Sequence, residues 1–108
     1  MGFDSAQPNK PLNLIYMKIN LNKPLCQPNG KPIEGLNIAE QLADGLANQL
    51  RSKNPRKVWG WCQELHKSKS LELDATDYDL LVEEINQAEG FSVLFRGQVL
   101  DELAKQKK

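Results

Sequence analysis

The stretch that decides the fold is Asn37–Ser52, with the sequence NIAEQLADGLANQLRS. Large aliphatic residues recur there at every fourth position, and alanines follow three of them. These residues are Ile38, Leu42, Leu46 and Leu50, with Ala39, Ala43 and Ala47. The spacing places them on one side of a helix as a wide apolar stripe. Asn37 and Glu40 have the spacing of a capping box, in which each side chain hydrogen-bonds the other residue's backbone N–H. The pattern predicts an amphipathic helix that ends near Ser52 and packs closely against other helices.

A small β element is expected before this helix. Apolar and polar residues alternate from Lys18 to Asn22, which is the period of a half-buried strand, and Pro24 ends that strand or marks an edge position. Pro28–Gly30 is a turn signal, because Asn and Gly tolerate the positive φ of tight turns. Lys31–Ile33 then forms the return arm of a hairpin. Ser70–Asp74 also alternates; it is too short to assign, but as a strand it would pair with the segment near Lys18.

Three further helices are predicted after the central one. The first two have apolar residues at i, i+3, i+4 and i+7, and the last carries four apolar residues over about two turns. The three faces are Val58, Trp61, Cys62 and Leu65; Tyr78, Leu81, Val82 and Ile85; and Phe95, Val99, Leu100 and Leu103. The predicted caps are Asn54, followed by Pro55 at the first helical position; Asp74 or Thr76; and Ser92. The second helix is expected to run to about His66 and the third to stop at Gly90. The predicted class is α+β, a small N-terminal β-hairpin element followed by about four packed helices.

A chain of 108 residues has room for one domain with one modest core. We expect a single compact domain over residues 17–104 and a basic tail over residues 105–108. Glycines, prolines and asparagines interrupt any period in residues 1–16. This leader is therefore expected to be poorly ordered or a non-native start, with Met17 as the natural first residue.

The composition is that of an ordinary soluble protein, with 40% hydrophobic and 26% charged residues. The formal net charge is zero, so no overall field draws the chain to nucleic acid or to an anionic membrane. The sequence has no apolar run of about 18 residues and no basic head followed by an apolar stretch. We expect a cytoplasmic protein without membrane association. Cys26 and Cys62 are too few and too far apart for a disulfide framework and are expected to be small packed thiols.

Charge is balanced overall but not locally. Arg51–Lys69 carries six basic residues against one acidic residue, whereas Ser70–Gly90 carries seven acidic residues and no basic one. Two adjacent segments of opposite sign are expected to attract each other within the fold or across a dimer. A binding patch is the alternative interpretation.

The residues that carry catalytic or metal chemistry elsewhere are not combined here in a suitable pattern. His66 is the only histidine and is read as a solvated residue at a helix end. Cys62 lies four residues before it on the same helical face, but a metal would need two further ligands, and Cys26 with an acid is a contrived set. A helix would scatter the carboxylates of Asp74, Asp77 and Asp79. We expect no catalytic residue, no cofactor and no metal, and therefore no enzyme.

A cluster of cations and one aromatic residue is the candidate partner contact. It consists of Arg51, Lys53, Arg56, Lys57 and Trp59. Trp59 and Trp61 point about 200° apart on a helix, and Trp61 fits the apolar face, so Trp59 is expected to be partly exposed. An exposed Trp is typical of a contact with a partner or a neighbouring helix. Aromatic rings beside cations also stack on nucleic-acid bases, which keeps that alternative open.

Several short motifs resemble small uncharacterised open reading frames of prophages, over Met17 to Leu103. The motifs are Asn22–Leu25, Asn29–Ile33, the helix with Leu42-Ala43 and Leu46-Ala47, Leu71–Asp74 with Leu80-Leu81, and Gln98–Leu100. The resemblance implies a non-enzymatic accessory role, for example in phage assembly, and no site residues. Phe3–Pro8 also resembles short translated intergenic repeats of some bacterial genomes, which imply nothing about function.

Two functions are therefore expected from different classes. The first is a protein-interaction or assembly accessory module of a mobile element, either homo-oligomeric or bound to a phage or host protein. The alternative is a nucleic-acid-binding accessory protein that uses the basic segment Arg51–Lys57 and Trp59.

Overall fold

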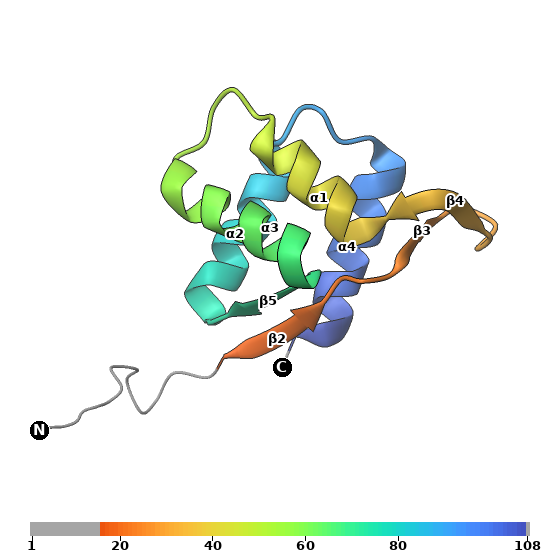
Figure 1. Cartoon of the computed structure of the whole chain (residues 1–108), viewed down its shortest axis with the longest axis horizontal. Coiled ribbons are helices and arrows are strands. Elements are labelled where there is room, and N and C mark those ends of the chain that lie inside the picture. The colour runs from red at the N-terminus through yellow and green to blue at the C-terminus, as the bar shows by residue number, and fades with distance from the viewer. Residues whose placement is uncertain (1–15, 108) are drawn as a thin grey trace, which may run out of the picture.

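The computed structural model describes residues 16–107 and has an α+β architecture over that range (Figure 1). In chain order the elements are β2 (Met17–Asn20), β3 (Pro24–Cys26), β4 (Pro32–Asn37), α1 (Ile38–Ala47), α2 (Pro55–Ser68), β5 (Ser70–Leu73), α3 (Ala75–Gln87) and α4 (Val93–Gln106). The predicted class, a small β element with four helices, is confirmed for these residues. The expected leader, up to residue 15, and the last residue of the expected tail lie outside the described range.

The strands of the described range form two separate antiparallel pairs, β2 with β5 and β3 with β4. The hairpin turn at Pro28–Gly30 is confirmed, with Gly30 at φ +88° and its N–H bonded to the carbonyl of Gln27. The arms of that hairpin are β3 and β4, whereas the strand near Lys18 is β2. It pairs with β5, and Ile19 lies opposite Leu71. The sequence left the segment after α2 unassigned; it is a strand, and it pairs with the strand near Lys18.

The N-terminal end of α1 is capped as predicted on one side only. The side-chain oxygen of Asn37 accepts from the N–H groups of Ala39, at 2.9 Å, and Glu40, at 3.3 Å. The side chain of Glu40 forms an ion pair with Lys69 instead of closing the capping box, with Nζ and Oε2 3.3 Å apart. This contact joins the start of α1 to the residue that ends α2.

The prediction that the central helix extends to Ser52 is wrong, because α1 ends at Ala47. Asn48 ends it: its backbone N–H and its side-chain amide both donate to the carbonyl of Asp44, at 3.1 and 2.7 Å. A side chain that competes for a helical carbonyl favours termination. Leu50, expected on the apolar stripe, consequently lies beyond the helix and is 99% exposed.

The predicted apolar face of α2 is confirmed, and all four of its residues are buried. The helix runs slightly beyond His66, to Ser68, where Lys69 adopts a left-handed conformation with φ +58°. The side chain of Asn54 makes no capping hydrogen bond, so only its backbone carbonyl contributes, by accepting from Val58.

The caps of the last two helices are confirmed. The side chain of Asp74 accepts from the N–H of Asp77 at the start of α3, and Ser92 does the same for Phe95 at the start of α4. The prediction that α3 stops at Gly90 is wrong, because α3 ends at Gln87. The guanidinium of Arg96 reaches back from α4 and donates to the carbonyls of Ala88 and Phe91. These bonds provide donors for two backbone carbonyl groups that follow the end of α3.

Aliphatic side chains from α1, α2, α3, α4 and β2 with β5 meet in one core. Its largest fully buried members are Ile19, Leu21, Leu42, Leu65, Leu73, Leu81, Ile85, Val99 and Leu103. Leu46 is also buried, as the helical stripe predicts, whereas Val82 and Leu100 are only partly buried. Glu84 is buried with them, and its carboxylate accepts from Ser52 Oγ at 3.0 Å and Gln49 Nε2 at 3.3 Å. These bonds fix the linker between α1 and α2.

A row of polar residues at four-residue spacing on α4 holds the segment Asn20–Cys26, which runs beside that helix in Figure 1. The side-chain amide of Gln98 accepts from the N–H of Cys26 at 2.8 Å and donates to its carbonyl at 2.5 Å. Gln106 makes the same two bonds to Asn20, at 2.7 and 2.8 Å. Between them, Glu102 pairs with Lys23, with Oε2 and Nζ 3.0 Å apart.

Glu102 is a buried carboxylate that its neighbours keep ionised. Burial alone would raise the pKa of this carboxyl, but hydrogen bonds from Lys23, Gln106 and Lys105 outweigh burial and hold its pKa below the ordinary value of 4.5. A carboxylate with a lowered pKa in the folded state stabilises the fold above its ordinary pKa. That contribution is lost as the pH falls through the lowered value.

We therefore expect Glu102→Gln to destabilise the protein by about 1–3 kcal/mol at pH 7, because charge-assisted hydrogen bonds are lost. Urea unfolding between pH 3 and pH 7 would show the wild-type and variant stabilities converging below pH 4.5. Glu83→Gln is the matched control, because Glu83 lies exposed on α3. A constant gap between wild type and Glu102→Gln across this range would contradict the assignment.

Candidate functional site

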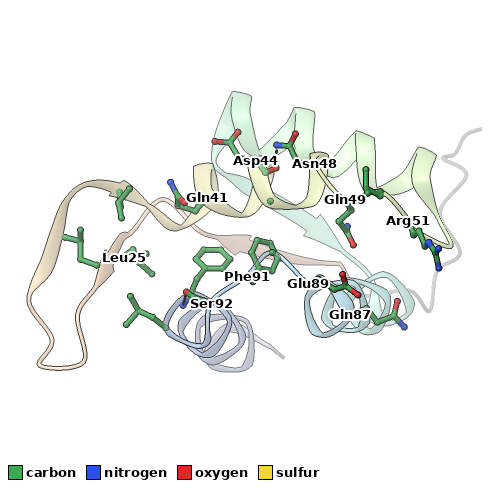
Figure 2. Close-up of a pocket in the computed structure, with 17 residues that line it drawn as sticks. Leu25, Gln41, Asp44, Asn48, Gln49, Arg51, Gln87, Glu89, Phe91 and Ser92 are labelled. Atoms are coloured by element: carbon green, nitrogen blue, oxygen red, sulfur yellow. Dashed lines mark hydrogen bonds between the residues drawn. The ribbon is translucent and has the colours of Figure 1, made fainter.

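An open groove of about 1090 Å³ lies between α1 on one side and the α3–α4 loop on the other (Figure 2). The β3–β4 hairpin closes one end, and the α1–α2 linker borders the other end. The apolar lining is concentrated at the hairpin end, where the hairpin meets the start of α4. It is formed by Leu25, Ile33, Leu36, Phe91, Leu94 and Phe95.

Polar side chains border this apolar floor. Gln41 and Asp44 of α1 and its C-cap residue Asn48 are spaced at i, i+3 and i+7, so they lie on one side of that helix. The opposite end of the groove is lined by Gln49, Arg51, Gln87 and Glu89. Apart from the charges of Asp44, Arg51 and Glu89, the polar lining consists mainly of amide and hydroxyl groups that both donate and accept hydrogen bonds.

The floor of the groove depends on Gly45. A Cβ atom at this position would lie 1.9 Å from Cε1 of Phe91, so only glycine lets the ring lie against the backbone of α1. Phe91 in turn packs on Phe95, with ring centroids 4.7 Å apart and planes tilted by 44°. The two rings connect α1 to the start of α4.

Gly45→Ala is therefore expected to displace the Phe91 ring and to lower stability by about 1–3 kcal/mol, the usual cost of overpacking. Gly97→Ala is the matched control, because a Cβ at Gly97 in α4 meets no atom within 4 Å. The control should gain up to about 1 kcal/mol from helix propensity. Urea unfolding and the aromatic proton shifts of Phe91 would test both variants. A gain of stability in both would contradict the close contact.

The sequence-predicted contact residues lie on the α1–α2 linker and the first turns of α2. They differ in whether their charges are already paired within the fold. Lys57 is bound to Asp77, with Nζ and Oδ1 2.5 Å apart, which joins the basic and acidic segments within the fold. Arg51, Lys53 and Arg56 are exposed, and no ion pair to them is found within residues 16–107. Trp59 is 56% exposed, as its helical position predicts.

Trp59 lines a second, smaller hollow of about 250 Å³. Leu50, Pro55 and Val58 form its apolar wall, and Arg51 borders it. The hollow shares Gln49, Leu50 and Arg51 with the groove, so the two concave regions adjoin at the linker. Of the predicted contact residues, Arg51 and Trp59 are therefore those that line concave surface.

The residues weighed for chemistry do not form a reactive pair. Burial raises the pKa of the Cys62 thiol to about 11, with a further increase from the Asp44 carboxylate, so the thiol is protonated at neutral pH. His66 is exposed near the end of α2. Residues 16–107 contain no group of three or more His, Cys, Asp or Glu side chains that could hold a metal ion. In the same range, no helix combines the length and apolarity needed to cross a membrane.

The sequence did not identify the groove, because its apolar residues come from four separate elements. Phe91 offered the one available signal: it is a large aromatic residue directly after Gly90, outside every helical period.

Comparison with known proteins assigns no relative to the chain. No protein-family model, no curated protein and no solved structure matches it.

Proposed function

We propose that this protein is a non-enzymatic interaction module whose groove holds an apolar segment of a partner protein. The observation that carries the proposal is the groove itself, with its apolar floor around Phe91 and its polar border along α1. An apolar centre surrounded by polar groups is the usual anatomy of a protein interface.

The groove favours an extended peptide segment as the occupant. Gln41 and Gln87 line it, and within residues 16–107 no hydrogen bond reaches either side-chain amide. Amides of this kind match the alternating N–H and carbonyl groups of a peptide backbone. Apolar side chains of the segment would fit the floor, which Leu25 of β3 and Leu94 of α4 both line.

The cellular setting is part of the proposal. The resemblance of residues 17–103 to small prophage proteins supports an accessory role in a mobile element, with a phage or host protein as the partner. The protonated Cys62 thiol supports a function without nucleophilic catalysis. A cytoplasmic location is proposed on the composition of the sequence.

Two adjacent residues of α4 allow a sharp test. Leu94 lines the groove, whereas Val93 is 86% exposed and does not line it. A displayed library of random peptides should yield binders with spaced apolar residues. Fluorescence polarisation should show at least ten-fold weaker binding to Leu94→Glu and unchanged binding to Val93→Glu. Circular dichroism establishes that both variants are folded. If the library yields no binder, or if both variants bind equally, the groove is not the binding site.

Nucleic-acid binding is the second candidate, because Arg51, Lys53 and Arg56 are exposed around Trp59. Our proposal predicts no mobility shift of a single-stranded DNA oligonucleotide at about 50 mM salt, where phosphate contacts are strongest. A shift that weakens steeply with salt and is lost in both Arg56→Ala and Trp59→Ala would establish the second candidate instead. Lys18→Ala, on β2, is the matched control for loss of one positive charge.

A further inference from the structure

The solvent face of α2 has a feature that the groove does not use. Arg56, Gly60 and Glu64 follow one another at four-residue spacing, and all three are exposed. Residues at this spacing lie in one row along a helix. The row therefore carries a cation, a position without a side chain, and an anion in that order.

Nothing within the fold requires glycine at position 60. A Cβ atom there would meet no atom within 4 Å, and the residue lies in the middle of α2 without a positive φ. Glycine in such a position costs the helix about 1 kcal/mol relative to alanine. Its physical effect is to let another backbone approach the helix closely.

Exposed apolar surface lies beside this row. Trp59 is 56% exposed and Leu50 is 99% exposed, and both line the small hollow that also contains Pro55. Two of the three exposed large hydrophobic residues in the described part of the chain thus gather at one flank of α2. Such a cluster on a monomer marks an interaction surface.

We propose that a second copy of this chain packs on this face, with the two α2 helices antiparallel and a two-fold axis at Gly60. In this arrangement, Arg56 of each copy lies opposite Glu64 of the other. The Leu50 and Trp59 side chains of both copies lie on the same side of the crossing, because a two-fold axis perpendicular to the helix pair keeps them there. The contact buries the apolar cluster and pairs Arg56 with Glu64.

Charge complementarity argues for a second copy over an unrelated partner. When a second copy of the row runs in the opposite direction, each cation lies opposite an anion, as an isologous contact requires. Lys57, the neighbouring cation, is already bound to Asp77 within the chain, so Arg56 is the unpaired cation of that turn within residues 16–107. Glu64 accepts a hydrogen bond from Ser68 Oγ at 2.7 Å, but its carboxylate stays exposed.

Gly97 on α4 provides the comparison within the same molecule. A Cβ there also meets no atom within 4 Å, but a two-fold axis at Gly97 would set Val93 against Asp101. That face has no complementary charge. Open space at a helical glycine therefore does not by itself make a self-complementary surface. The row on α2 has the open space and, in addition, charges that are complementary across the two-fold axis.

Substitution of the two glycines separates the dimer contact from effects on folding. Gly60→Gln and Gly97→Gln should both raise the thermal midpoint of unfolding, because glutamine favours a helix. Sedimentation equilibrium of the full chain should show a concentration-dependent wild-type dimer. Its dissociation constant should rise at least ten-fold in Gly60→Gln and stay unchanged in Gly97→Gln. A wild type that is monomeric at every concentration, or equal dissociation constants in both variants, would overturn the proposal.

Charge exchange tests the antiparallel arrangement. Arg56→Glu and Glu64→Arg should each weaken the dimer at least ten-fold, because each places like charges opposite one another. An equimolar mixture of the two variants should restore association, since a mixed pair is complementary at both ends. If the mixture associates no better than either variant alone, this helix contact is wrong. The readout does not involve Leu94, so loss of the dimer and loss of peptide binding in the groove are separate results.

Discussion

The hydrogen bonds between α4 and the segment Asn20–Cys26 are the interaction on which the rest of the structure depends. β2 and β3 are short, and within residues 16–107 each pairs with one strand, so the edges that face α4 need other partners. Gln98 and Gln106 supply them, because a side-chain amide presents the same donor and acceptor as a peptide group. Glu102 adds an ion pair between the two amides. Two small strand pairs are thereby joined to one helix without a continuous sheet.

This attachment also determines where the groove forms. Because Gln98 holds β3 against the first half of α4, the hairpin lies beside the start of α4, opposite the middle of α1. The α3–α4 loop must then pass close to α1. Gly45 permits the Phe91 ring to fill this narrow passage. The concave surface therefore results from two contacts. Gln98 attaches β3 to α4, and the Phe91 ring packs against Gly45 of α1.

The elements that the sequence predicted correctly are those governed by local chemistry. Apolar periodicity located the buried face of α2, and the caps at Asp74 and Ser92 follow from the short side chains that accept backbone N–H groups. The errors have non-local or competing causes. Asn48 ended α1 before the apolar period did, and Gln98 reads as an ordinary surface residue until the hairpin it binds is in place.

The candidate contact residues were also only partly predictable, because the sequence shows charge but not pairing. Lys57 forms an ion pair with Asp77 within the chain. Arg51 lines both the groove and the small hollow, and Trp59 lines the hollow. The groove and the proposed α2 contact adjoin at Leu50 and Arg51. A dimer through α2 would therefore present two grooves, and the linker end of each groove would lie near the two-fold axis. Two linked sites raise the effective concentration for a partner that carries repeated segments, so weak binding in each groove would suffice for assembly.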